Sequence, residues 1–383
     1  MCLNAVSKSQ MPPCAENDKP LLLVIAHSGR MLAVAARKAG FRVLVIDVYA
    51  DLDTCAAAVA VTRVNSLAVA DIQPAVDGFI AQYGVGQLVY GSGFEYHPES
   101  LVYLARHLTI IGNQPATFMR LLDKPDFFAA LCRLAIAHPE TRFVAPEAHG
   151  DWLVKPLYGQ GGVGVCHYHA GMQTQGVYWQ RYRTGQQHSV LFLAAAGQAH
   201  IIGFNRQWSM AVGQQAFMFA GICNASGLAD AHQRTVMAWL EQLVAEFGLV
   251  GINSMDFIVD DRQLWLLEIN PRPSASMQLY DANLWVRHCS AVQGELRAYP
   301  RAPGVSAMQI VYAPKDLTIP AHFVWPDGCQ DLPAAGTQCL AGQPLCSILA
   351  HGPQARGVYN ALLTTQRQLL RRLLKDAPLP IPI

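Results

Sequence analysis

The chain has 383 residues, of which 52% are hydrophobic, so it is long enough for two or three domains whose cores need no disulfide support. Its net charge is +1 and only 14% of its residues are charged, which excludes the strongly basic surface typical of nucleic-acid binding. No apolar run approaches the ~18 residues that a membrane-spanning helix needs. We therefore expect a globular protein that binds neither nucleic acid nor a membrane.

The beginning of the chain and its cysteines indicate a cellular compartment. Residues 1–17 contain no continuous apolar segment, so we predict a flexible leader rather than a signal peptide. The ten cysteines are scattered and none forms a Cys-x-x-Cys pair, which argues against a zinc site. Large chains without a secretory signal keep their thiols reduced, so we expect free cysteines and a cytoplasmic protein.

Residues 18–115 alternate between apolar runs and helical segments. The run "PLLLVIA" is broken by "HSGR"; the helical "MLAVAARKAG" follows and ends on Gly40, before a second run, "FRVLVID". The pattern returns with a strand near 87–90, a glycine-rich loop and a helix near 98–107. These βαβ units predict a Rossmann-like α/β domain with its ligand loops at the carboxyl ends of parallel strands.

The remainder of the chain has an α+β pattern. Residues 115–135 have helical composition with an interruption at Pro125, and short strands joined by turns extend from Phe143 to Asn270. After about residue 296 the chain is rich in proline and glycine, with short strands, and it ends in a helix at 358–374. One further helix, at 234–248, carries an apolar stripe formed by Val236, Met237, Leu240, Leu243, Val244 and Phe247.

The stretch "LVKPLYGQGGVGV" at 153–165 places Lys155 before a run of glycines. A P-loop requires Lys and Ser or Thr after its last glycine, a dinucleotide loop requires a helix there, and a kinase-type loop carries its lysine on the next strand. Here the alternating "VGVCHYH" predicts a returning strand. Two interpretations remain: a loop whose backbone N–H groups contact phosphate beside Lys155, or an ordinary hairpin with a mobile tip. The glycines concerned are Gly159, Gly161, Gly162 and Gly164.

The segment "GINSMDFIVDDRQLWLLEINPRPSAS" predicts a β-hairpin with strands at 251–260 and 264–270. A three-residue loop at 261–263 places Asp256 opposite Glu268, and strand alternation puts Asn270 on the face of Glu268. Two carboxylates and an amide oxygen are hard ligands that suit Mg²⁺. Arg272 follows, with a guanidinium that can grip a phosphate or a carboxylate. The alternative is that both carboxylates are merely solvated strand residues.

Taken together, these residues resemble the ATP-grasp superfamily, from the N-terminal domain to about Arg272. The resemblance implies an ATP-grasp domain at 116–295, preceded by the α/β domain at 18–115 and followed at 296–383 by a small β-rich extension with a terminal helix. It implies that Lys124 in "LLDKPDFF" and Lys155 contact phosphates, and that the glycine loop covers the triphosphate.

The same resemblance assigns the segment "VYWQRYRTGQQHSVLF" to adenine and ribose. Gln180 and Gln187 stand where the superfamily often has acidic residues, but their amides can still bond the adenine amino group and the ribose hydroxyls. Arg181 and Tyr182 are expected to bond the adenine edge through backbone groups.

The activity that the resemblance implies is a ligation. ATP phosphorylates a carboxylate, and an amine attacks the acyl phosphate to give an amide, ADP and phosphate. Lys155 and Arg272 are the expected catalytic residues. One or two Mg²⁺ ions, or Mn²⁺ in their place, are expected on Asp256, Glu268 and Asn270. The expected partners are a small-molecule acid and amine and, by analogy, a second copy of the chain. The alternatives are another amino-acid or dipeptide ligase and a nucleotide-binding regulator without turnover.

The substrates are indicated less directly. The stretches "GSGFE", "IGNQPATFMRLLDKP" and "EINPRPSAS" are similar to ATP-grasp proteins of C1-carrier cofactor synthesis. This implies joining the γ-carboxylate of glutamate to tyramine or tyrosine, as in methanofuran-type biosynthesis. Ser28, Gly29 and Arg30 are candidates to hold a carboxylate, and Glu95 to hold an ammonium group, with surface turns as the alternative. Ser274 and Ser276 are further candidate substrate contacts.

Overall fold

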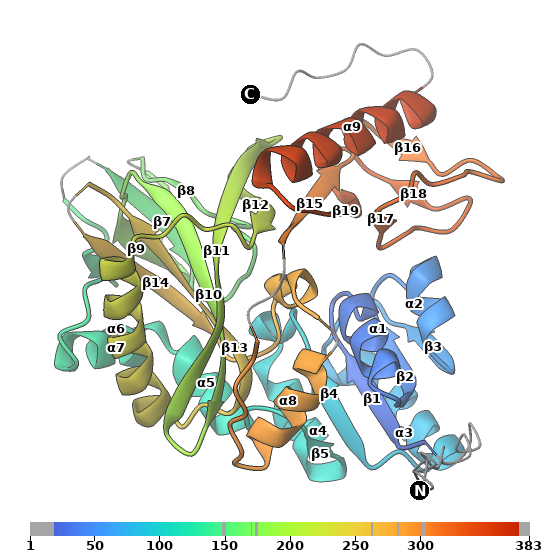
Figure 1. Ribbon diagram of the computed structural model, residues 1–383, viewed down its shortest axis with the longest axis horizontal. Helices are drawn as coiled ribbons and strands as arrows, with labels where there is room; N and C mark the ends of the chain where they lie inside the picture. Colours follow the sequence, from blue (N-terminus) through green and yellow to red (C-terminus); the bar gives the residue numbers. More distant parts are fainter. Residues whose placement is uncertain are drawn as a thin grey trace, which may run out of the picture.

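The computed structural model describes residues 19–147, 151–169, 171–172, 175–261, 263–281, 283–300 and 304–374. The predicted leader at 1–17 lies outside these ranges. Figure 1 shows an α/β domain at the N-terminal end, a long curved sheet with helices on its two faces, and a C-terminal extension crossed by the last helix. The fold is therefore the mixed α/β and α+β arrangement that the sequence predicts.

The N-terminal domain is a five-stranded parallel sheet in the order β3-β2-β1-β4-β5. Alternate residues of β1 and β2 face opposite ways, so that Val24 packs with Leu32 of one helix and Leu23 with Ile72 of another. The predicted helix stop is confirmed, because Gly40 adopts a φ of 95° after the first helix. The strands are β1 (Leu21–Ile25), β2 (Arg42–Asp47), β3 (Ala60–Arg63), β4 (Gln87–Tyr90) and β5 (Thr109–Ile110). The helices are α1 (Arg30–Lys38), α2 (Leu52–Ala57), α3 (Val69–Tyr83) and α4 (Pro98–His107), with a 3₁₀ turn, η2, at Phe94–Tyr96.

Two short helices connect this domain to the next, α5 (Pro115–Leu122) and α6 (Lys124–Arg133). The break between them lies at Asp123 and not at the predicted Pro125. The Asp123 side chain accepts a hydrogen bond of 3.1 Å from the Asp126 N–H and thereby caps α6. Pro125 lies in the first turn of α6, where a missing N–H costs nothing.

A small antiparallel sheet follows, with the strand order β6-β9-β7-β8. Its core is built around Trp152, Val154 and Trp179. The strands are β6 (Thr141–Arg142), β7 (Trp152–Pro156), β8 (Cys166–His167) and β9 (Val177–Arg181).

The large sheet has eight strands in the order β14-β13-β10-β11-β12-β15-β19-β17. One face of β10 and β13 packs against α7 (Asp230–Phe247); the other packs against α8 (Asn283–Val292) and the helix α1 of the N-terminal domain. The strands are β10 (Gln186–Ala195), β11 (Gln198–Val212), β12 (Gln215–Cys223), β13 (Gly251–Val259), β14 (Leu264–Asn270), β15 (Val305–Tyr312), β17 (Cys329–Gln330) and β19 (Pro344–Gly352).

The apolar stripe predicted for α7 needs one correction. Val236 and the other predicted members are buried, but Met237 is 49% exposed and Trp239 is buried in its place. Met237 follows Val236 directly, so it is turned about 100° around the helix axis and away from the sheet.

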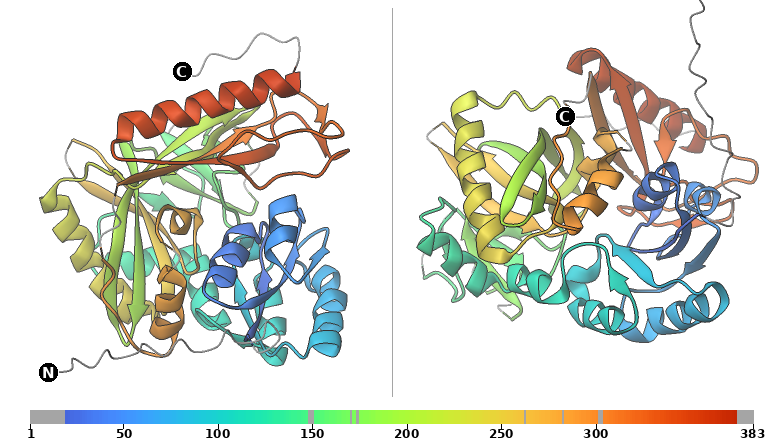
Figure 2. Two further views of the ribbon diagram at one scale, coloured as in Figure 1. Left: turned by 45° about the vertical axis from the view of Figure 1, so that its right-hand side comes forward. Right: turned by 60° about the horizontal axis from the view of Figure 1, so that its bottom comes forward.

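Three strands of the C-terminal extension, β15, β17 and β19, continue the large sheet. β15 pairs with β12 on one side and β19 on the other, and α9 (Ala355–Leu374) packs across β15 and β19. A two-stranded ribbon, β16 (Leu317–Thr318) with β18 (Gln338–Cys339), completes it. Figure 2 shows that the extension overhangs the strand ends of the N-terminal domain.

Candidate active site

The predicted hairpin is present, and it brings Asp256 opposite Glu268 and Ser254 opposite Asn270. This pairing register is the predicted one, but the connection that produces it is not the expected three-residue loop. Val259 pairs with Leu264, which makes the connection four residues long, and a β-bulge between Asp256 and Phe257 restores the pairing. Bulges of this kind re-aim side chains next to functional sites.

The carboxylates of this hairpin are crowded together. Asp256 accepts hydrogen bonds from Gln207 Nε2 (2.8 Å) and Asn270 Nδ2 (3.1 Å). Burial and the neighbouring Glu268 raise the pKa of Asp256 to about 7. Two carboxylates held in contact in a partly buried position repel each other, and a divalent cation between them removes the repulsion. These oxygen donors are of the type that Mg²⁺ prefers, and a magnesium site on them stays a prediction.

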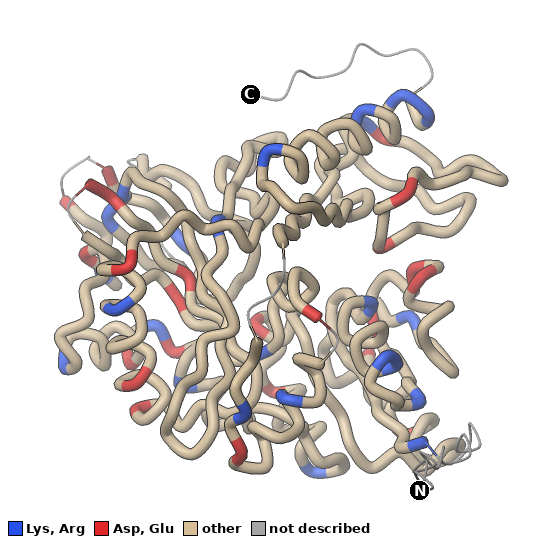
Figure 3. Tube along the Cα trace, viewed as in Figure 1, with Lys and Arg blue, Asp and Glu red and all other residues tan. Residues whose placement is uncertain are grey.

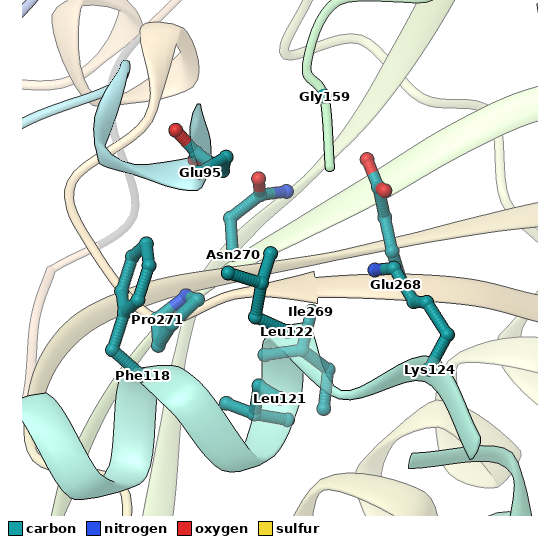
Figure 4. Close-up of a pocket in the computed structure, with 10 residues that line it drawn as sticks. All are labelled: Glu95, Phe118, Leu121, Leu122, Lys124, Gly159, Glu268, Ile269, Asn270 and Pro271. Carbon is teal, nitrogen blue, oxygen red and sulfur yellow. The ribbon is translucent and has the colours of Figure 1, made fainter. Parts of the chain in front are cut away.

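Two lysines face the hairpin from the other side. Lys124 begins α6 and lines one cavity together with Glu268, Asn270 and Gly159 (Figure 4). Lys155, on β7, donates to Gln180 Oε1 at 3.1 Å. Burial lowers the pKa of Lys155, while the nearby charges of Glu268 and Asp256 oppose this effect. Lys155 is therefore close enough to Glu268 and Asp256 for their charges to interact.

The glycine loop is anchored and is not a free hairpin tip. The strand that follows the glycine loop, β8, pairs with β7, so the predicted returning strand is confirmed. Gly161 O accepts from the Phe219 N–H at 2.9 Å, and the Gly164 N–H donates to Gln215 Oε1 at 2.7 Å. A Cβ on Gly162, which has a φ of 82°, would lie 1.9 Å from Phe217 O. Glycine is therefore required where the loop meets β12.

The segment expected to hold adenine uses its polar groups internally. Gln180 is 1% exposed, and its amide bridges Lys155 and Thr141 Oγ1 (3.1 Å). The N–H of Arg181 donates to Glu140 O, and that of Tyr182 to Asp151 O. Gln187 donates to Ser209 Oγ at 3.0 Å. Gln180 thus anchors the Lys155 ammonium, a role that the sequence does not reveal.

Arg272 is 7% exposed and links the hairpin to the N-terminal domain. Its Nε donates to Glu95 Oε1 at 2.7 Å, and its Nη2 donates to Asn270 Oδ1 at 3.1 Å. The second oxygen of Glu95 accepts from the Gly93 N–H at 2.7 Å. Both oxygens of Glu95 therefore bind groups of the protein itself, and not the ammonium group of a ligand that the sequence predicts. Glu95 instead orients Arg272 beside the carboxylates.

A sequence profile described as an ATP-grasp domain matches residues 121–276, which contain both lysines, the glycine loop and the hairpin. These residues form an ATP-grasp domain. The predicted fold class is confirmed, and the match lies within the range 116–295 expected for this domain.

Solved structures share the arrangement around the ATP-grasp domain. The biotin carboxylase domain of Hydrogenobacter thermophilus 2-oxoglutarate carboxylase is 14% identical, with a TM-score of 0.69 over 91% of this chain and 89% of that one. N5-carboxyaminoimidazole ribonucleotide synthetase from Thermotoga maritima is also 14% identical, with a TM-score of 0.66 over 91% and 98%. Rhizobium etli pyruvate carboxylase is 12% identical, with a TM-score of 0.69, and this chain spans 37% of its length. These likenesses establish the fold. No curated protein matches the sequence significantly.

The loop Ser28–Arg30, at the end of β1, does hold a carboxylate, and that carboxylate belongs to the protein. Asp331 of the extension accepts from Ser28 Oγ at 3.2 Å and from Arg30 Nε at 2.8 Å. Gly29 donates its N–H to Asp47 Oδ2 at 3.0 Å, and a Cβ at Gly29 would lie 2.6 Å from Val45. The loop therefore joins the N-terminal domain to the extension.

The two serines after the hairpin contact each other, with 2.9 Å between the hydroxyl oxygens of Ser274 and Ser276. Ser276 is buried. Two residues that no sequence pattern indicates, Tyr90 and Asn113, fix the turn before these serines. Tyr90 donates from its hydroxyl to Pro271 O at 3.2 Å, and Asn113 Nδ2 donates to the same oxygen at 2.9 Å. An N-terminal strand end thus positions the backbone beside Arg272.

Among the described residues, no group of three His, Cys, Asp or Glu side chains could hold a metal ion. The hairpin site has two carboxylates and an amide, so its third ligand is not of that type. Within the same residues, no helix is both long and apolar enough to cross a membrane. The eight cysteines that lie in the described ranges are free, as expected.

Proposed function

We propose that this chain is an ATP-dependent ligase that joins a carboxylate to an amine through an acyl phosphate, releasing ADP and phosphate. The observation that carries the proposal is the cavity in which Lys124, Glu268 and Asn270 meet beneath Gly159 (Figure 4). Phosphoryl transfer requires neutralised charge and fixed positions more than a covalent catalyst, and this cavity offers both.

Each wall has a separate task in the proposed reaction. Lys124 and Lys155 neutralise the phosphates, and the anchored glycine loop presents backbone N–H groups to them. Asp256, Glu268 and Asn270 would hold one or two Mg²⁺ ions, or Mn²⁺, which supply positive charge against the phosphate oxygens. Arg272, held by Glu95 and Asn270, stabilises the negative charge that develops when phosphate is transferred to the carboxylate. The segment that carries Gln180, Arg181, Tyr182 and Gln187 completes the proposed nucleotide site, and Gln180 acts there through the Lys155 ammonium that it holds and not on the base.

ADP release by the purified protein tests the proposal. We expect ADP to form only when a suitable acid and amine are present together with Mg²⁺, and the Glu268→Gln variant to form it at least about 100-fold more slowly. Substrate-dependent ADP release that is unchanged in this variant would rule out the mechanism. Tight nucleotide binding without ADP release for any acid and amine would favour the alternative, a nucleotide-binding regulator without catalytic turnover.

For the substrates, we propose glutamate as the acid and an aromatic amine such as tyramine or tyrosine, as in methanofuran-type cofactor synthesis. The support is the resemblance of "GSGFE" and "EINPRPSAS" to proteins of that pathway. Mass spectrometry of the product across a panel of acids and amines tests this assignment. A product from a different amino acid or dipeptide, and none from glutamate, would refute it.

Bicarbonate is a second candidate for the acid. The Hydrogenobacter thermophilus structure is described as a complex with MgADP, ADP and bicarbonate, and that structure and the Thermotoga maritima synthetase share this fold. The same cavity could then activate bicarbonate for attack by an amine. ADP release that requires added bicarbonate in degassed buffer, and no amino acid, would favour this candidate.

We also propose that the protein is cytoplasmic and forms a homodimer. The Hydrogenobacter thermophilus biotin carboxylase domain is described as a dimer, and it has the same fold as this chain. Light scattering of the purified protein measures its mass directly. A mass near 41.8 kDa would identify a monomer and contradict the dimer.

A further inference from the structure

Tyr96 of the N-terminal domain lies at the edge of the candidate active site. It is the last residue of η2 and follows Glu95 directly. Glu95 lines the cavity that also contains Lys124 and Gly159. Figure 4 shows Glu95 and Gly159 above the hairpin strand, with Asn270 between them in this view. Tyr96 is therefore positioned next to the residue through which the N-terminal domain lines this cavity.

The Tyr96 hydroxyl reaches the glycine loop. A Cβ on Gly159 would lie 3.6 Å from Tyr96 Oη, which is an ordinary van der Waals distance. The other neighbours of this Cβ are Pro156, at the end of β7, and Val163, within the loop. Since Gly159 lines the cavity, Tyr96 joins the N-terminal domain to the glycine loop at the edge of this cavity.

The backbone beneath Tyr96 is fixed, although its side chain is 44% exposed. The Tyr96 N–H donates to Gly93 O at 3.3 Å, and the Gly93 N–H donates to Glu95 Oε2 at 2.7 Å. Phe94, the first residue of η2, is buried and meets the Tyr90 ring edge to face at 5.8 Å. A tyrosine on such a support has only two side-chain torsions to fix, so it loses little conformational entropy when it binds a ligand.

The Tyr96 hydroxyl is a donor that the protein does not use, because no described residue forms a hydrogen bond with it. Two other donors near the glycine loop already have partners, since the Lys155 ammonium donates to Gln180 and the Gly164 N–H donates to Gln215. Lysine and arginine positions are spread over the described chain (Figure 3). A phosphate bound beside the loop would therefore gain from an additional O–H donor.

The position of Tyr96 favours the terminal phosphate as the group that it contacts. Glu95, the preceding residue, pairs with Arg272 at 2.6 Å, and Arg272 donates to Asn270. In the proposed reaction, Arg272 stabilises the charge that develops when phosphate is transferred. Tyr96 is thus adjacent to this ion pair, and its hydroxyl lies against the loop that is proposed to contact the phosphates.

We propose that the Tyr96 hydroxyl donates a hydrogen bond to the terminal phosphate of bound ATP, so that the N-terminal domain contacts the group that is transferred. This contact rests on the proposed function for the identity of the nucleotide. A hydrogen bond to a charged phosphate oxygen is stronger than one between neutral groups, and ADP lacks the phosphate that would accept it. Tyr96 should therefore distinguish ATP from ADP.

Calorimetric titration with Mg·ADP and with the magnesium complex of AMP-PNP, a non-hydrolysable ATP analogue, tests the inference. We expect Tyr96→Phe, which keeps the ring and removes the hydroxyl, to bind AMP-PNP about tenfold more weakly than the wild-type protein. Its affinity for Mg·ADP should change by less than about twofold, which would also show that the variant is folded. The matched control is Tyr103→Phe, which removes a hydroxyl hydrogen-bonded to Asp77 at 3.2 Å, between α4 and α3, and should change neither affinity.

An unchanged affinity of Tyr96→Phe for AMP-PNP, or an equal loss of affinity for both nucleotides, would overturn the inference. Failure of the proposed function gives a different result. ADP release that depends on an acid and an amine would then be absent, while Tyr96→Phe would still lose affinity for AMP-PNP alone, which refutes the ligase and supports the contact. A wild-type protein that binds neither nucleotide would refute both.

Discussion

Replacement of Glu268 by Gln should stabilise the protein without ligands and abolish its stabilisation by nucleotide. The pKa of Asp256 is raised from 3.8 to about 7, first by burial and then by Glu268. A shift of roughly 3 units corresponds to about 4 kcal/mol against the ionised form. Since burial is the larger cause, removing the charge of Glu268 should recover on the order of 1–2 kcal/mol at pH 8.

The sign of this effect depends on pH. At pH 8 Asp256 is ionised in the folded protein and repelled by Glu268, so Glu268→Gln relieves a cost. At pH 5, below the raised pKa, Asp256 is already protonated, and the gain should largely disappear. Glu241→Gln, an exposed substitution on α7, is the control.

Urea denaturation in EDTA measures the first effect, and the shift of the midpoint on adding Mg·ADP measures the second. At a ligand concentration of 100 times Kd the wild-type protein should gain about 2.7 kcal/mol, and Glu268→Gln almost none. A variant that is less stable at both pH values, or that keeps the full nucleotide shift, would refute the view that the two carboxylates face one cation.

Three further predictions concern the anchors of the site. Gly162→Ala should clash with Phe217 O and weaken Mg·ADP binding about tenfold in calorimetry. Gly161→Ala is the control, because this position has open space and a similar positive φ. Equal losses of affinity in both variants would show that the clash has no role. Asp331→Ala should lower the free energy of unfolding by roughly 3 kcal/mol at pH 7, because Arg30 is left buried without its main partner. This loss should shrink as the pH falls below the lowered pKa of Asp331. An unchanged urea midpoint at pH 7 would contradict the prediction. The pKa of Asp51 is raised from 3.8 to about 7 by burial and neighbouring carboxylates. Asp51→Asn should therefore increase the free energy of unfolding above pH 7 by no more than about 4 kcal/mol, and by progressively less towards pH 4. A gain that grows towards acid pH would contradict the raised pKa.

The chemistry of the hairpin could be predicted from sequence because its information is local. Asp256, Glu268 and Asn270 lie within fifteen residues of one another, and strand alternation fixes their common face. The register was nevertheless reached by a bulge, which no residue type announced. The predicted loop was one residue too short and the bulge was not predicted, and these two errors cancelled to give the correct pairing.

Contacts between distant parts of the chain could not be predicted in the same way. Arg30 and Asp331 are separated by 301 residues, and nothing in the sequence around either indicates the other. The segment at Ser28–Arg30 was therefore expected to bind a substrate carboxylate, whereas it binds one from the extension. Glu95 was likewise interpreted without Arg272, which lies 177 residues away.

The central claim is that lysines and carboxylates from opposite walls meet on one nucleotide. A crystal structure with Mg²⁺ and a non-hydrolysable ATP analogue tests it most directly. We predict a metal ion bound by Asp256, Glu268 and Asn270, with the terminal phosphates between that ion and the ammonium groups of Lys124 and Lys155. A nucleotide bound elsewhere, or a metal-free hairpin with Lys155 turned away from the phosphates, would contradict the account.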